Sequence, residues 1–187
     1  KLKDLWKING YEISDLLKKK EVSAAEICNK LIEHIEKINP KINAIVVETF
    51  EDAKKQAKIL DKKIKEGENI GMLAGVPTTI KVNTDQIGYP STNGLRIQKD
   101  LIAKKDSPVV KNLRNSDALM LGKTNTPAFS IHWFTRNSLH GHTLNPHNKN
   151  ITPGGSSGGA AAATAAGMGA IGHGTDIAGS IRYPAYA

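Results

Sequence analysis

Two glycine-flanked serine loops stand out in the sequence: Pro153-Gly154-Gly155-Ser156-Ser157-Gly158-Gly159 and Gly174-Thr175-Asp176-Ile177-Ala178-Gly179-Ser180-Ile181-Arg182. Between them, residues 160–166 are small and are expected to form a helix that other backbone can approach closely. Glycine lets the peptide N–H groups of a loop turn inward, as the binding of an oxyanion or a phosphate requires. We therefore expect any chemistry of this chain to lie at these loops.

The residues before these loops alternate between helical and strand-like patterns. Helices are expected at 11–20, from a capping box at Ser23 and Glu26 to Pro40, at 53–67, and from Ser107-Pro108 onward. Strands are expected at 76–82, 118–122 and 169–174, whereas 123–150 has the composition of a loop. This alternation predicts an α/β layer fold.

Charge and composition exclude several classes of protein. The net charge of +8 comes mainly from lysines in the first third, which are interleaved with acids on the expected helices. Beyond Asn150 only Asp176 and Arg182 are charged, so a basic surface for nucleic acid is not expected at the serine loops. No apolar run is long enough to cross a bilayer. The single cysteine, Cys28, lies on an apolar helical stripe and fits a reducing cytoplasm.

Three interpretations of the loops compete. They could be plain turns around a tightly packed alanine helix. They could bind phosphate, but neither loop ends in Gly-Lys-Ser/Thr; Gly122-Lys123-Thr124 does, with Asp117 where the first glycine is required. The third interpretation is a serine nucleophile. A metal site at His132, His140, His142 and His147 is not favoured, because their spacing matches no standard ligand pattern.

A serine nucleophile needs a base. The pattern G-x-S-x-G occurs twice, centred on Ser156 and on Ser157, but no hydrophobic strand precedes it. No histidine follows Asp176, which argues against a Ser-His-Asp hydrolase in that chain order. A lysine can serve instead if burial lowers its pKa. Lys81 lies in the middle of an apolar strand pattern and is the candidate.

The chain closely resembles the amidase signature family over nearly its whole length. The matching residues are Gly75-Val76-Pro77, Ile80-Lys81, Gly122-Lys123-Thr124-Asn125-Thr126-Pro127, Asn137, Gly141, Thr143, Asn145-Pro146 and the two serine loops. The two loops at this separation are highly specific for the family. The resemblance implies a mixed β-sheet flanked by helices. It also implies that 1–187 is the N-terminal part of one domain, truncated on its C-terminal side, with a helical region about 1–68 and part of the catalytic core about 69–187.

The resemblance also implies a role for each matching residue. Ser180 is the expected nucleophile, Ser156 the bridging serine after a cis peptide bond, and Lys81 the base. The expected oxyanion hole consists of backbone N–H groups, those of Ile177, Ala178, Gly179 and Ser180. The expected supporting residues are Ser157, Thr175, Asp176 and Arg182. Val82 departs from the family's usual aspartate, and His173 stands where an apolar residue is usual.

The function implied is an amidase for linear amides that needs no cofactor or metal. Two alternatives stay open: the glutamine-hydrolysing component of a tRNA-dependent amidotransferase, and a non-catalytic fragment. Thr126-Pro127-Ala128-Phe129 resembles the general amidases better than the amidotransferase component. The expected partners are a small amide substrate, the remaining C-terminal portion of the domain and a second copy in a homodimer, with neither nucleic acid nor membrane.

Overall fold

The structure is a computed structural model that describes the backbone of residues 2–187 and the side chains from Asp4 onward. A four-stranded mixed sheet has the order β1-β3-β2-β6. Strand β2 (Pro77–Lys81) is parallel to β3 (Leu119–Thr124) and to β6 (Ile171–Gly172), and β1 (Ile45–Glu48) is antiparallel to β3. The predicted α/β class is therefore confirmed.

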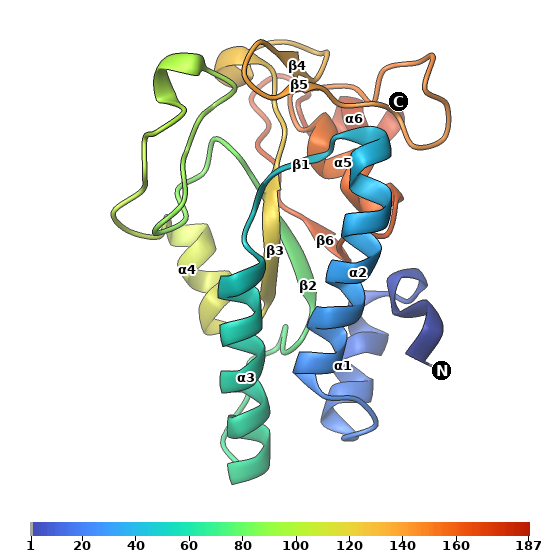
Figure 1. Cartoon of the computed structure of the whole chain (residues 1–187), viewed down its shortest axis with the longest axis vertical. Coiled ribbons are helices and arrows are strands. Elements are labelled where there is room, and N and C mark those ends of the chain that lie inside the picture. The colour runs from blue at the N-terminus through green and yellow to red at the C-terminus, as the bar shows by residue number, and fades with distance from the viewer. Residues whose placement is uncertain (1) are drawn as a thin grey trace.

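Helices lie on both sides of this sheet (Figure 1). The N-terminal ones are the 3-10 helix η1 (Leu2–Lys7), α1 (Gly10–Lys18), α2 (Ala24–Ile42) and α3 (Phe50–Glu66). Leu119 and Leu121 pack with α2 and α3 in the main core. Between them in sequence, Met120 points to the other face, where it packs with Ile80 and with Val110 of α4 (Pro108–Asn115). Such alternation is expected of a strand that is buried on both faces.

Helix α2 begins as the sequence predicts but ends later. The Ser23 hydroxyl accepts from Glu26 N at 3.1 Å, and Ser23 N donates to the Glu26 carboxylate at 2.8 Å, which completes the capping box. The expected stop at Pro40 is wrong, because the proline lies in the last turn. Asn43 N still donates to Asn39 O at 2.7 Å, which completes that turn. Asn43, in the left-handed conformation, ends the helix.

Other boundaries also differ from expectation. Lys123 and Thr124 belong to β3, and a small hairpin of β4 (Arg136–Asn137) and β5 (Gly141–His142) interrupts the expected loop. The N-terminal region is not only helical, because it supplies β1. Two further 3-10 helices lie in the connections, η2 (Arg96–Gln98) and η3 (Ala128–Ser130). Within residues 2–187, no helix is long and apolar enough to cross a membrane.

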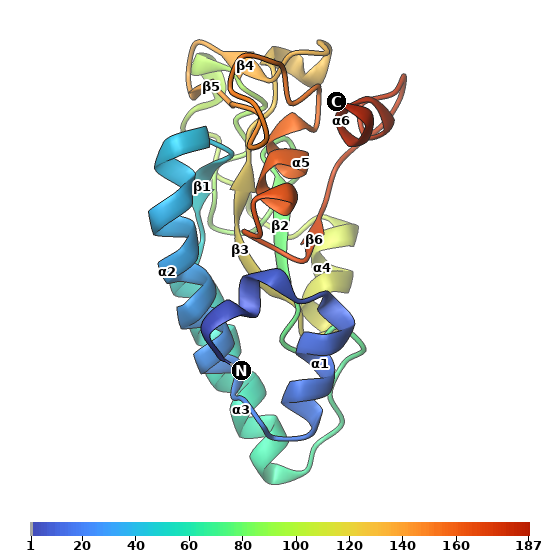
Figure 2. The ribbon, with the colours of Figure 1, turned by 90° about the vertical axis from the view of Figure 1, so that its right-hand side faces the viewer.

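The small-residue helix α5 (Gly158–Ala165) lies against the sheet near the end where β2 finishes. A Cβ at Gly159 would lie 2.5 Å from the backbone nitrogen and oxygen of Asn125, so the helix approaches that loop backbone to backbone. Helix α6 (Arg182–Tyr186) follows the second serine loop. Figure 2 shows α5, α6 and the β4–β5 hairpin at the same end of the molecule. Both serine loops are therefore brought to one end of the sheet.

Candidate active site

Lys81 is the last residue of β2, and its side chain is fully buried. Its Nζ contacts three hydroxyl groups: Ser156 Oγ at 2.7 Å, Ser157 Oγ at 3.0 Å and Thr175 Oγ1 at 2.8 Å. The strand thus joins the two serine loops through one amine. The cis peptide bond expected between Gly155 and Ser156 is present.

The surroundings of Lys81 favour its neutral form. Burial lowers the pKa of Lys81 to about 8, while the negative charge of Asp176 works in the opposite direction. No carboxylate of the described residues bonds to Nζ, and Val82, in the position where the family usually has aspartate, is buried. A lysine with such a pKa can accept a proton near neutral pH.

Ser157 connects the two loops and uses its own proton to do so. Its Oγ donates to Thr175 O at 3.2 Å and accepts from Thr175 N at 3.2 Å. Its backbone N–H donates to Ser180 O at 3.1 Å. The Ser156 hydroxyl, by contrast, has Lys81 as its only partner among residues 2–187. Ser157 is therefore tied to the second serine loop, whereas the Ser156 hydroxyl contacts Lys81 within the described residues.

The second serine loop is organised around the Asp176 carboxylate. Asp176 accepts from Gly179 N at 2.7 Å, from Ile181 N at 3.0 Å and from the backbone and guanidinium of Arg182 at 2.9–3.2 Å. The Arg182 side chain and these N–H groups hold the pKa of Asp176 well below its ordinary value. Ser180 itself is half-buried, and its hydroxyl has no partner in the described part of the chain.

The four expected oxyanion donors are not equivalent. The N–H of Gly179 is already bonded to Asp176. Within residues 2–187, the N–H groups of Ile177, Ala178 and Ser180 have no partner in the protein. An oxyanion hole needs donors that are fixed but not already engaged. The N–H groups of Ile177, Ala178 and Ser180 are not already engaged, whereas that of Gly179 is.

If Ser180 is the expected nucleophile, Asp176→Asn should slow its modification by a fluorophosphonate about 10- to 100-fold, because the second serine loop loses its charged anchor. The pKa of Lys81 should also fall further, because the Asp176 charge favours the ammonium form. Labelling rates and the pH dependence of hydrolysis would measure both effects. Asp100→Asn, at a largely exposed carboxylate, is the matched control. Labelling of Asp176→Asn at the parental rate would contradict the anchoring role.

The remaining sequence candidates do not contact Lys81 Nζ. Gly122-Lys123-Thr124 forms part of β3, so it is not a phosphate loop. His173 Nδ1 is buried without a hydrogen-bond partner, and burial together with the charge of Lys81 lowers the pKa of His173. The histidines expected not to bind metal have other contacts; for example, His140 Nε2 lies 2.7 Å from Thr92 Oγ1.

Sequence reasoning missed a second buried lysine and a polar network beside the site. Lys123 Nζ donates to Pro90 O at 2.7 Å, and burial lowers its pKa to about 8. Asn83 Nδ2 donates to Ser130 Oγ at 3.1 Å and lies 3.5 Å from Thr175 Oγ1. Thr126 Oγ1 donates to Ser156 O at 3.0 Å. Lys123 and Thr126 belong to matched blocks, but nothing in their sequence pattern shows what they contact.

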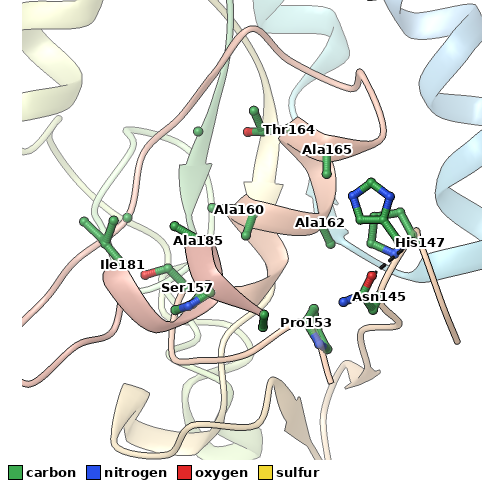
Figure 3. A pocket seen from close by; sticks show the side chains of 16 residues that line it. Asn145, His147, Pro153, Ser157, Ala160, Ala162, Thr164, Ala165, Ile181 and Ala185 are labelled. Carbon is green, nitrogen blue, oxygen red and sulfur yellow. Dashed lines mark hydrogen bonds between the residues drawn. The ribbon is translucent and has the colours of Figure 1, made fainter. Parts of the chain in front are cut away.

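A cavity of about 410 Å³ lies beside the first serine loop. Figure 3 shows Ser157, Ala160 and Ile181 at its wall, together with other small residues of α5. Most of its lining is apolar, and Pro184 of α6 and Pro153 also take part. Of the three hydroxyl residues around Lys81 Nζ, Ser157 lines this mainly apolar cavity.

A buried lysine therefore joins two glycine-rich serine loops at one end of a mixed sheet. The sequence model of the family described as Amidase matches residues 26–187, and the chain belongs to this family, the amidase signature family. The predicted family is thereby confirmed. Solved structures of the family agree with the fold: a bacterial aryl acylamidase has a TM-score of 0.92 at 40% identity, over 95% of this chain and 37% of that one.

The curated relatives include proteins with two different functions. An indoleacetamide hydrolase of Bradyrhizobium diazoefficiens is 45% identical over 97% of this chain and 35% of its own length. A glutamyl-tRNA(Gln) amidotransferase subunit of Carboxydothermus hydrogenoformans is 41% identical over 97% of this chain and 38% of its own. The chain thus spans little more than a third of the length of these relatives.

Proposed function

We propose that this chain carries the catalytic residues of a hydrolase for linear carboxylic amides that works through an acyl-enzyme. Ser180 is the nucleophile, Ser156 transfers the proton, and Lys81 is the base. The observation that carries the proposal is the contact of 2.7 Å between the buried Lys81 Nζ and Ser156 Oγ. Membership of the amidase family supports the reaction class. The lone Cys28 is compatible with a cytoplasmic site of action.

The proposed mechanism needs Lys81 as a neutral amine, and the three contacts of its Nζ can be assigned to one. Such an amine has two N–H groups and one lone pair. Ser157 directs its proton to Thr175 O, so it accepts one N–H of Lys81, and Thr175 Oγ1 accepts the other. The lone pair is then available for the proton of Ser156. This assignment satisfies every hydrogen-bonding group of the amine.

The reaction follows from this arrangement. Lys81 takes the proton of Ser156 while Ser156 takes that of Ser180, and Ser180 Oγ bonds to the amide carbon. The unengaged N–H groups of Ile177, Ala178 and Ser180 stabilise the oxyanion. Lys81 returns the proton through Ser156 to the leaving nitrogen as the C–N bond breaks. Water then releases the carboxylate from Ser180. The relay requires Ser156 Oγ and Ser180 Oγ to be within hydrogen-bonding reach in the substrate complex.

The second candidate is glutamine hydrolysis within a tRNA-dependent amidotransferase. The 41% identity to the glutamyl-tRNA(Gln) amidotransferase protein favours it, whereas the somewhat higher identity to an indoleacetamide hydrolase favours a free-standing amidase. The two differ in substrate, and the chemistry at Ser180 is the same. Hydrolysis of indoleacetamide by the protein alone supports the first; release of ammonia from glutamine only with partner proteins present supports the second.

A fluorophosphonate probe tests the proposed nucleophile directly. We expect the intact protein to be modified at Ser180, as located by mass spectrometry of its peptides, because the probe reacts with activated serines. Modification should accelerate as the pH rises toward 8, in step with deprotonation of Lys81. No modification at any pH, in protein that is folded, would favour a non-catalytic role for the chain.

A further inference from the structure

Asn83 lies two residues after Lys81, and its side chain faces the polar groups around Lys81 Nζ. Its amide Nδ2 donates to Ser130 Oγ at 3.1 Å and to Thr175 Oγ1 at 3.5 Å. Its Oδ1 accepts from Thr84 Oγ1 at 3.2 Å. Because Thr175 Oγ1 also contacts Lys81 Nζ, Asn83 is connected to the proposed base through a single hydroxyl group.

The orientation of the Asn83 amide is fixed by its neighbours. The Ser130 hydroxyl donates its single proton to Asn93 Oδ1 at 2.7 Å, so it offers a lone pair to Asn83. The Thr84 hydroxyl donates to the other end of the amide. Both contacts require Nδ2, and not Oδ1, on the side of Ser130 and Thr175. Asn83 therefore presents an N–H group to Thr175.

The Thr175 hydroxyl has two contacts within residues 2–187. Its Oγ1 lies 2.8 Å from Lys81 Nζ and 3.5 Å from Asn83 Nδ2. A hydroxyl oxygen has two lone pairs and one proton, which rotates to suit its surroundings. An N–H group on the Asn83 side and an N–H group on the Lys81 side each favour a lone pair toward them. The proton of Thr175 is therefore directed away from both.

This orientation matters because a neutral Lys81 amine has only one lone pair. The proposed mechanism uses that lone pair for the proton of Ser156, whose Oγ lies 2.7 Å away. A rotated Thr175 hydroxyl would direct its proton to the same lone pair from 2.8 Å and compete with Ser156. The contact from Asn83 is long at 3.5 Å, but it has to select only one position of a freely rotating proton.

We propose that Asn83 is a positioning residue: its amide N–H keeps the Thr175 hydroxyl proton turned away from Lys81, so that the lone pair of the base is reserved for Ser156. The inference rests on the proposed function, because it concerns the availability of the proposed base. Asn83 acts only through Thr175, and this distinguishes it from a residue that merely supports the fold.

The test is a double-mutant cycle of Asn83→Leu and Thr175→Val in the intact protein, measured as the rate at which a fluorophosphonate labels Ser180. Both replacements keep the approximate size of the side chain and remove its polar group. At about pH 9, above the pKa of about 8 of Lys81, Asn83→Leu should slow labelling about fivefold. In the Thr175→Val background the same substitution should change the rate by less than about twofold, because no hydroxyl proton is left to orient.

Ser130→Ala tests the same inference with Asn83 in place, because it removes the bond that fixes the amide. It should slow labelling about two- to threefold in the parent and have no effect beside Thr175→Val. Asn112→Leu, at an exposed residue of α4, is the matched control and should be labelled at the parental rate. Thermal melts identify which variants are folded, and the Ser130 cycle decides the matter if Asn83→Leu is not.

The outcomes that would contradict the inference are distinguishable. Equal slowing by Asn83→Leu with and without the Thr175 hydroxyl would indicate a structural role and overturn this inference alone. Parental labelling of Asn83→Leu would overturn it as well. A folded Thr175→Val protein that is not labelled would do the same, since Thr175 would then do more than accept a bond. A parent that hydrolyses no amide and is not labelled at Ser180 would overturn the proposed function, and this inference with it.

Discussion

Ser180→Ala is expected to reduce amide hydrolysis by the intact protein by about 10⁴-fold or more, because no acyl-enzyme can form without the attacking oxygen. Thermal stability should hardly change. The hydroxyl has no partner among residues 2–187, and the bond from Ser157 N goes to the backbone oxygen of Ser180, which the variant keeps. Progress curves with a primary amide and a thermal melt would measure the two effects.

The matched control is Ser138→Ala, which removes a hydroxyl from an exposed serine that makes no hydrogen bond within the described residues. It should retain parental rates. Near-parental hydrolysis by Ser180→Ala would remove Ser180 from the mechanism. Ser156, whose hydroxyl lies 2.7 Å from Lys81 Nζ, would then be the first to test.

The sequence predicts those parts of the fold whose signals are local. The capping box at Ser23, the start of α4 after Ser107 and the end of α3 at Gly67 all depend on residues within one turn, and all three are present. Strand β1 was missed because its four residues pair with β3, far away in sequence. The expected stop at Pro40 was wrong because the proline removes the single helical bond of its own missing N–H, while Asn43 N still bonds to Asn39 O and closes the last turn.

For the site too, the sequence predicts which residues take part but not all of the contacts that they make. Lys81, Ser156 and Thr175 belong to matched blocks, and the structure places them within hydrogen-bonding distance. The engagement of Gly179 N by Asp176 could not be read from the sequence, because it depends on the path of the loop. The link from Asn83 to Ser130 joins segments 47 residues apart, and no pattern of spacing indicates it. Tertiary contacts of this kind can be identified only in the structure.

Activity of the intact protein is expected to rise with pH through a limb near 8, because the proposed relay needs Lys81 without its proton. The sign follows from the pKa. Burial holds the pKa of Lys81 at about 8, so above this pH the amine is neutral and below it the ammonium form predominates. Roughly a tenth of the enzyme is then competent at pH 7, and the rate should increase about tenfold between pH 7 and the plateau.

Deprotonation of two other groups could also produce a rise of activity with pH, and variants distinguish them from Lys81. Burial also brings the pKa of Lys123 to about 8, so Lys123→Met is the necessary control: it should keep the limb if Lys81 is the base. His173 has a pKa lowered from 6.5, and a base there would give a limb at more acidic pH. The position of the limb therefore distinguishes His173 from the lysines, and the Lys123 variant distinguishes the two lysines.

Substitution of Lys81 itself is the decisive measurement. Lys81→Ala should remove most acylation, a loss of about 10²- to 10⁴-fold, which is the usual range for a general base. Lys81→Arg should not restore the rate, because a guanidinium keeps its proton and has no lone pair for the Ser156 proton. The three hydroxyls around Nζ lose their partner in Lys81→Ala, so circular dichroism should first show that the variant is folded. A Lys81→Arg protein with near-parental rates and an unchanged limb would place the base elsewhere, with His173 as the next residue to replace.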